Sequence, residues 1–249
     1  MIMIIMNKTL ILLLIPFVCF GQLKFLPESK GQLVNHTYYS LSYIEEHEQA
    51  EWVHYRLDSI MLKGCEPRKN SFKQDTKDSI TSSSVDYNYK KYKYQRGHLI
   101  PAADMKLNPI SMSESFYMSN ISPQNSSFNK GKWLDLEKLI RAWANQNEVF
   151  ITAGGVLNCG LDKITGGVSV PELYYKIIYD TNNEKMIGFL MPNKSIEGDL
   201  KSYVVSVEII EAITNINFFP KLENSSQLES SVCLSDWNFD LIFKFPKCN

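Results

Sequence analysis

Short stretches of alternating or continuous apolar residues predict several β-strands along this chain. Residues 38–43 alternate between apolar and polar side chains, and residues 47–57 contain a similar aromatic and apolar run. The continuous apolar run at residues 149–153 is typical of a buried strand. Gly154 and Gly155 follow it, and we expect them to turn the chain.

A hairpin and a helix are predicted in the second half of the chain. Residues 174–179 and 186–191 are apolar runs on either side of the turn-forming residues 181–183, which predicts a β-hairpin. Residues 207–213, followed by Asn215, predict a helix, although this segment also carries strand signals.

The clearest helical pattern covers residues 130–145. Asn129 stands at its start and Gly131 just inside it. Apolar residues recur on one face of this helix at Trp133, Leu136, Ile140 and Trp143.

With no internal repeat and no linker, the elements together predict a single α+β domain, in which helices flank a mixed or antiparallel central sheet.

The first 21 residues predict a signal peptide. Lys8 is their only charge, residues 10–20 form an apolar run, and Gly21 offers a cleavage point. The run is short for a membrane span, so we expect an exported, soluble protein with residues 22–249 as its one domain and no membrane association. A periplasmic and a secreted destination both remain open.

Composition and charge limit the classes of protein to which this chain can belong. With 249 residues and 44% hydrophobic content, the chain can bury a sizeable core, which argues against disorder. The formal net charge of -1 gives no sign of a polyanionic partner. Basic residues nevertheless gather between residues 63 and 96, which fits either a phosphate-attracting patch or an ordinary solvated face.

Four cysteines remain after the signal peptide: Cys65, Cys159, Cys233 and Cys248. They lack the close spacing of a zinc site, and in an exported chain we expect disulfides. Four cysteines allow three pairing schemes. The short loop between Cys233 and Cys248 favours that pair, and the pairing is otherwise left open.

Residues that could take part in catalysis are concentrated between positions 94 and 141. Residues 96–98 stand where an aromatic run gives way to residues 99–101, which predicts a strand leading into a bend. His98 suits a general base, because an unperturbed imidazole is largely neutral near pH 7. A structural role is the alternative for a histidine taken alone.

Oxygen ligands for a metal follow in the sequence. Asn129 offers an amide oxygen and Glu137 a carboxylate, and a hard cation such as Mg²⁺ takes such ligands together with water. If the intervening residues are helical, the two positions lie about 12 Å apart along the axis, so we expect Glu137 to reach the ion through water. Arg141, one turn beyond Glu137, could pair with it or reach phosphate, and an ordinary surface pair is the alternative.

Several motifs, in one order, resemble the DNA/RNA non-specific endonuclease family. The resemblance covers residues 36–220 and implies a ββα-metal (His-Me finger) active site in an endonuclease G-like nuclease. The stretches that carry it are WVHY at residues 52–55, PRKNSF at 67–72, RGHLIPAAD at 96–104, FYMSNISPQ at 116–124 and FNKGKWLDLEKLIR at 128–141.

The resemblance implies a role for each candidate in this region. His98 would activate the attacking water, and Asn120 would support the histidine and the metal. Asn129 would be the direct protein ligand of Mg²⁺, with Mn²⁺ as a candidate substitute, and Glu137 would act through a metal-bound water. The implied reaction is hydrolysis of DNA and RNA to products with 5′-phosphates.

The resemblance also implies contacts with the nucleic acid. Arg68, Arg96 and Arg141 would bind phosphate or stabilise the transition state. Because phosphate contacts carry no base information, we expect cleavage without sequence specificity. A homodimer is compatible with the sequence, and the binding of an inhibitor protein is left open.

One position departs from the family pattern. The family usually has Asp where this chain has Gln95, at a position expected to hold Arg96 or its loop. The lost negative charge predicts reduced or shifted activity rather than its loss. The alternative is a catalytically silent relative that binds nucleic acid in a salt-sensitive way and forms no product.

Overall fold

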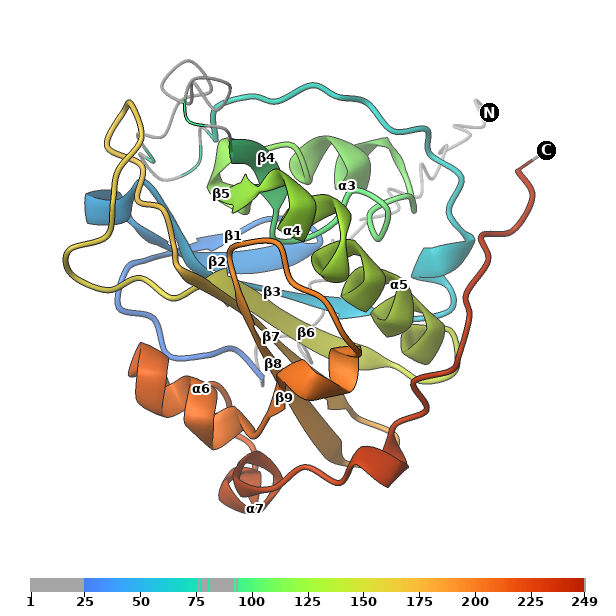
Figure 1. Ribbon diagram of the computed structural model, residues 1–249. Helices are drawn as coiled ribbons and strands as arrows, with labels where there is room; N and C mark the ends of the chain where they lie inside the picture. Colours follow the sequence, from blue (N-terminus) through green and yellow to red (C-terminus); the bar gives the residue numbers. More distant parts are fainter. Residues whose placement is uncertain (1–24, 76, 78–79, 81–91, 93, 249) are drawn as a thin grey trace, which may run out of the picture.

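The computed structural model describes residues 25–75, 77, 80, 92 and 94–248, so the expected signal peptide lies outside the described residues. The described chain forms a large sheet, a separate two-stranded ribbon and helices on both faces of the sheet (Figure 1). The strands are β1 (Gln32–Asn35), β2 (Tyr39–Ile44), β3 (Gln49–Leu57), β4 (Tyr94–His98), β5 (Ile121–Asn125), β6 (Val149–Gly155), β7 (Leu173–Asp180), β8 (Lys185–Pro192) and β9 (Val204–Val205). The helices are α3 (Pro109–Glu114), α4 (Ser126–Lys130), α5 (Lys132–Ala144), α6 (Val207–Thr214) and α7 (Ser225–Ser230).

Every pairing in the main sheet is antiparallel. Its seven strands follow the order β1-β2-β3-β6-β7-β8-β9, so neighbouring strands are consecutive in the chain except for β3 and β6, which pair although β4 and β5 lie between them in sequence. The expected hairpin is confirmed by the pairing of β7 with β8 along their full length. This sheet, with a few helices around it, confirms the α+β class.

Helices cover both faces of the sheet. On one face, α5 packs Trp133 and Trp143 into the core. On the other face, Ile210 of α6 and Phe218 beyond it pack around Trp52, so the helix expected at residues 207–213 is confirmed. Within the described chain, no helix combines the length and apolar character that a membrane crossing requires.

A ββα unit is inserted between β3 and β6. β4 and β5 pair antiparallel along their full length, and α4 follows β5 directly. The unit lies on the same face of the sheet as α5 (Figure 1). Ser122 of β5 ties it to the sheet, because its hydroxyl donates to the Gln49 side chain and lies 2.6 Å from the Tyr174 hydroxyl.

The prediction of a turn at Gly154 and Gly155 is wrong, because both residues continue β6. Their backbone pairs in register with β7. A Cβ at Gly154 would lie 2.1 Å from the carbonyl oxygen of Glu51. Glycine therefore permits a close approach between backbones here and does not change the chain direction.

The helix expected at residues 130–145 is confirmed by α5 over Lys132–Ala144, but a break at Gly131 interrupts its start. Gly131 has a non-helical backbone (φ -103°, ψ -114°) and separates α4 from α5. A Cβ there would lie 2.4 Å from the carbonyl oxygen of Ser127, so a larger residue would force this break to shift. Asn129 consequently belongs to α4 and Glu137 to α5, and the spacing calculated for one continuous helix does not apply.

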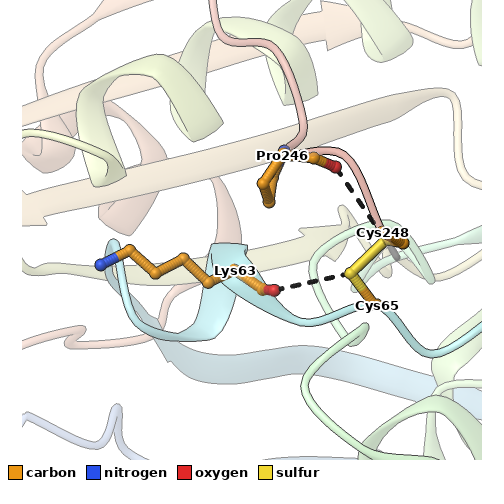
Figure 2. Close-up of a disulfide and its surroundings, with 4 residues drawn as sticks. All are labelled: Lys63, Cys65, Pro246 and Cys248. Carbon is orange, nitrogen blue, oxygen red and sulfur yellow. Dashed lines mark hydrogen bonds between the residues drawn. A yellow bond between two sulfur atoms is a disulfide. The ribbon is translucent and has the colours of Figure 1, made fainter.

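The disulfide joins Cys65 to Cys248, so the expected pairing of Cys233 with Cys248 is wrong (Figure 2). Cys159 and Cys233 are free and exposed. Loop-closure entropy varies only slowly with loop length, so it favours the short loop weakly. The tertiary structure decides the pairing instead.

The C-terminal tail, residues 238–248, shows how the fold determines which cysteine pairs with Cys248. Trp143 of α5 holds the start of the tail, since its indole nitrogen donates to the Asn238 carbonyl oxygen at 2.8 Å and its ring lies 5.7 Å from that of Phe239. From there the tail runs past α5 toward the loop after β3, which carries Cys65 (Figure 1). The tail is thereby led away from Cys233.

His54 links stability to pH. It is fully buried on β3, its Nδ1 lies 2.8 Å from the Thr152 hydroxyl oxygen, and burial lowers its pKa to about 3. In the unfolded chain this histidine binds a proton below a pKa of about 6.5, so acid favours unfolding by about 1.4 kcal/mol for each pH unit between that value and the folded-state pKa of about 3. His54→Gln is therefore expected to reduce the loss of stability between pH 6 and pH 4.

Urea unfolding of both proteins at pH 8, pH 6 and pH 4 measures this effect. At pH 8 the histidine is neutral in both the folded and the unfolded state. The difference in free energy of unfolding between the wild type and His54→Gln at that pH therefore reports the packing cost of the substitution alone. The same loss of stability on acidification in the two proteins would contradict this role of His54.

Candidate active site

His98 is the last residue of β4, and it faces the same side of the ribbon as Arg96 because side chains alternate along a strand. The expected strand leading into a bend is confirmed. The Leu99 amide donates to the Asn120 carbonyl oxygen at 3.0 Å, and Trp133 Nε1 donates to the His98 carbonyl oxygen at 3.4 Å. The backbone on which the imidazole stands is thus fixed by contacts from two other segments.

Two phenylalanines flank the His98 ring. The ring centroids of Phe72 and Phe116 lie 5.5 Å and 5.0 Å from that of the imidazole. His98 Nε2 is buried and has no hydrogen-bond partner among the described residues. Burial, followed by the positive charge of Arg68, lowers the pKa of His98 to about 3. The ring is therefore neutral at pH 7.

Arg68 and Arg96 lie over the same two rings. The Arg68 guanidinium is 5.3 Å from the centroid of Phe116, and the Arg96 guanidinium is 5.0 Å from that of Phe72. Such cation–π contacts hold guanidinium groups in place. The structure thus brings the two arginines together with His98. Sequence reasoning gave neither phenylalanine a role, although both belong to the matched motifs.

A buried carboxylate anchors the loop that carries Arg68. Asp75 Oδ2 lies 2.9 Å from His36 Nε2 and also accepts a hydrogen bond from the Ser119 hydroxyl. Asp75 and Ser119 are both fully buried. Because Ser119 lies in the segment that supports His98, the arginine loop and the histidine are fixed relative to each other.

Asn120 fixes the backbone that follows His98. Its Oδ1 accepts from the Ile100 amide at 2.9 Å, and its Nδ2 donates to the carbonyl oxygens of Ile100 (3.0 Å) and Ser115 (2.9 Å). All these bonds go to the main chain. Asn120 therefore supports the histidine through the backbone rather than through the imidazole.

Asn129 and Glu137 are the candidate metal ligands. Asn129 Nδ2 donates to Gln95 Oε1 at 3.1 Å, while its Oδ1 has no partner among the described residues. Glu137 is 8% exposed, and its carboxylate has no hydrogen bond or ion pair within the described chain. Burial raises the pKa of Glu137 to about 7, against the lowering effect of the positive charges on Lys176 and Arg141.

This donor set fits a hydrated hard cation. An unpaired amide oxygen and an unpaired buried carboxylate are ligand types that Mg²⁺ takes while it keeps several waters. The described part of the chain holds no group of three histidine, cysteine, aspartate or glutamate side chains that could form a complete protein cage. Asn129 and Glu137 carry oxygen atoms of the types that such an ion takes, and water would complete its shell.

Arg141 belongs to a buried ion pair. Its Nη1 lies 2.7 Å from Asp104 Oδ1, and the residue is 3% exposed. The Tyr55 hydroxyl donates to the other oxygen of Asp104 at 2.8 Å. The alternative of a surface pair with Glu137 is thus wrong, and a phosphate contact by Arg141 stays a prediction that its burial does not favour.

Lys176 is a buried residue of this region that sequence reasoning missed. From β7, its Nζ donates to the Leu99 carbonyl oxygen at 3.1 Å and lies 4.4 Å from the centroid of the Trp133 ring. Burial lowers the pKa of Lys176, and the negative charge of Glu137 opposes that effect. The one signal in the sequence was a lysine inside an apolar strand run.

Gln95 contacts α4 and not the side chain of Arg96. Its Nε2 donates to the Ser126 hydroxyl at 2.9 Å, and its Oε1 accepts from Asn129. Gln95 and Arg96 point to opposite sides of β4 because they are adjacent in a strand. Of the two roles expected for position 95, holding the motif's arginine or its loop, the first is not performed by Gln95 through a side-chain hydrogen bond within the described residues.

Comparisons with known proteins agree with this geometry. A family model described as DNA/RNA non-specific endonuclease matches residues 20–225. Nuclease EXOG, mitochondrial, from Danio rerio is 31% identical over 235 residues, which cover 85% of this chain and 67% of the relative. A protein named Nuclease from Nostoc sp. is 30% identical over 78% of this chain and 76% of its own length. The chain belongs to the DNA/RNA non-specific endonuclease family.

A solved structure supports the same fold. The crystal structure of the EndoG/EndoGI complex matches with a TM-score of 0.70 and 25% identity, over 80% of this chain and 90% of that one. This match confirms the ββα-metal type of fold. The chain spans only 60% of the length of Nuclease EXOG, mitochondrial, from Mus musculus, to which it is 29% identical.

Proposed function

We propose that this protein is a metal-dependent endonuclease that hydrolyses phosphodiester bonds in DNA and RNA without sequence specificity. The observation that carries the proposal is the neutral, buried imidazole of His98 with two arginines on the flanking aromatic rings. A proton acceptor beside fixed positive charge is the combination that attack of water on a phosphodiester requires.

In this mechanism His98 takes a proton from the attacking water. Asn120 and Lys176 keep the backbone beside His98 in place through their bonds to the main chain. Arg68 and Arg96 bind the phosphate and offset the negative charge that develops on it. Because these contacts involve no base, DNA and RNA of any sequence are substrates. The water oxygen bonds to phosphorus, the bond from phosphorus to the 3′ oxygen breaks, and the leaving oxygen takes up a proton, so the products carry 5′-phosphates and 3′-hydroxyls.

Asn129 would hold a divalent cation directly, and Glu137 would reach it through water. Such a cation, Mg²⁺ or in its place Mn²⁺, would supply positive charge to offset the charge on the leaving 3′ oxygen. Two observations support this assignment: among the described residues, neither the Oδ1 of Asn129 nor the buried carboxylate of Glu137 has a hydrogen-bond partner.

We further propose that residues 1–21 direct export and that residues 22–249 act as one domain in the periplasm or the medium. The apolar run at residues 10–20 and the disulfide between Cys65 and Cys248 support this location, since disulfides persist in oxidising compartments. The solved complex of EndoG with EndoGI concerns inhibition of EndoG, and a protein inhibitor of this chain is an analogous proposal.

Chelation is expected to abolish cleavage, and Asn129→Ala is expected to raise the metal concentration needed for half-maximal rate. Both effects follow from the single direct protein ligand proposed for the ion. The measurement is degradation of plasmid DNA and of RNA by the purified protein in EDTA and in rising Mg²⁺ or Mn²⁺.

Asn145→Ala serves as the matched control, because Asn145 is an exposed asparagine at the end of α5. Cleavage that persists in EDTA would contradict a metal-dependent mechanism. Binding without product from a folded protein, across several divalent metals, would instead favour the silent relative.

A further inference from the structure

The geometry points to Gln95 as a positioning residue for the metal, a role that we propose here and that rests on the metal site of the proposed function. We infer that Gln95 turns the carboxamide of Asn129 so that its oxygen faces the cation. We also infer that the neutral glutamine makes cation binding weaker here than a carboxylate would.

Three side chains form a relay of hydrogen bonds that ends on Asn129. Gln95 Nε2 donates to the Ser126 hydroxyl at 2.9 Å, and Asn129 Nδ2 donates to Gln95 Oε1 at 3.1 Å. Ser126 and Asn129 stand on the short helix α4, while Gln95 stands on β4. The relay therefore joins the helix that carries the candidate ligand to the strand that carries His98.

The relay fixes which atom of Asn129 is available. A carboxamide has a donor end and an acceptor end, and a cation binds only the oxygen. With Nδ2 occupied by Gln95, the Oδ1 of Asn129 is the atom left without a partner in the described chain. If the Asn129 amide alone were reversed, its Oδ1 would face Gln95 Oε1, which is also an acceptor, so this hydrogen bond would be lost and the NH₂ group would face the ion.

Glutamine fixes this orientation less firmly than a carboxylate does. Its own amide can also reverse, donating to Asn129 Oδ1 while it accepts from Ser126, whereas a carboxylate only accepts hydrogen bonds. The cross-strand partner of Gln95 is Gln124, a second neutral amide that is fully buried and has no partner for either amide atom in the described chain. Neither residue supplies negative charge to the ion.

Two variants of nearly the same size separate hydrogen bonding from packing. Gln95→Met keeps the length of the side chain and removes the acceptor, so we expect Mn²⁺ to bind about 10- to 100-fold more weakly, the usual effect of losing a group that orients a ligand. Gln95→Glu keeps the acceptor and adds a charge, so we expect tighter binding than in the wild type. Ser126→Ala releases the far end of the relay, and we expect a smaller loss than in Gln95→Met.

The readout is the dissociation constant of Mn²⁺, measured without nucleic acid from the electron paramagnetic resonance signal of the free ion. Equal affinity in the wild type and Gln95→Met would overturn the positioning role. Weaker binding in Gln95→Glu than in the wild type would overturn the comparison with a carboxylate. Thermal unfolding of each variant confirms that the compared proteins are folded.

Asn129→Ala separates failure of this inference from failure of the proposed function. If Asn129→Ala binds Mn²⁺ as the wild type does, the metal site itself is misassigned and the inference falls with it. If Asn129→Ala loses binding while Gln95→Met retains it, the metal site stands and the role of Gln95 alone is wrong.

Discussion

Replacing His98 with alanine is expected to reduce the rate of phosphodiester cleavage by roughly 10²- to 10⁴-fold, the usual contribution of a positioned general base. The imidazole is the buried proton acceptor beside Arg68, and its lowered pKa keeps it neutral at pH 7. Cleavage of a labelled oligonucleotide under single-turnover conditions, with saturating Mg²⁺, measures the chemical step apart from product release. Added imidazole is expected to restore part of the rate by occupying the space left by the ring.

Two controls make the His98→Ala result specific. The substitution removes a ring packed between Phe72 and Phe116, so thermal unfolding must show that the variant is folded at the assay temperature. His54→Gln alters a buried histidine that has no part in the proposed mechanism and is expected to cleave at the wild-type rate. A folded His98→Ala protein with full activity would contradict the proposed mechanism.

Loss of the disulfide between Cys65 and Cys248 is expected to lower the free energy of unfolding by up to about 5 kcal/mol. The bridge joins residues separated by 183 positions, so it removes a large amount of conformational entropy from the unfolded chain. Part of this effect is offset, because a released C-terminal tail also gains freedom in the folded state. Thermal and urea unfolding with and without a thiol reductant give the size of the loss.

The double variant Cys65→Ser, Cys248→Ser separates the bridge from other effects of the reductant, and it is expected to match the reduced wild type. Cys159→Ser and Cys233→Ser are matched controls, because both residues are exposed and free. A reductant that destabilises the double variant as much as the wild type would contradict the assignment of the effect to this bridge.

Local sequence patterns predicted the parts of the structure that depend on neighbouring residues. The hairpin of β7 and β8 follows from two apolar runs around turn formers, and the strand that carries His98 follows from the residues on either side of it. The gathering of His98, Arg68 and Arg96 was also foreseen, through the motifs shared with the family. Those motifs record a tertiary arrangement that periodicity alone does not reveal.

The wrong or missed assignments at Gly154, Cys248 and Lys176 depend on contacts between distant residues. Gly154 is a glycine because the Glu51 backbone approaches it, and the disulfide of Cys248 depends on the hold of Trp143 on the tail. Lys176 comes from a strand nearly eighty residues beyond Leu99, whose carbonyl oxygen it meets. No pattern within one segment reports such partners. The sequence shows that Gln95 departs from the family pattern. Its contact with Asn129 could not be predicted, because it depends on how α4 is oriented against β4.

The anchored tail has a consequence for the fate of the chain after proteolytic damage. Ile242, near the middle of the tail, is 84% exposed and is an accessible point for a protease. A cut there would not release the fragment, because Cys248 remains joined to Cys65. The nicked molecule would keep its full mass until a reductant separated the two pieces, so a break in the chain and the loss of a segment are distinct events in this protein.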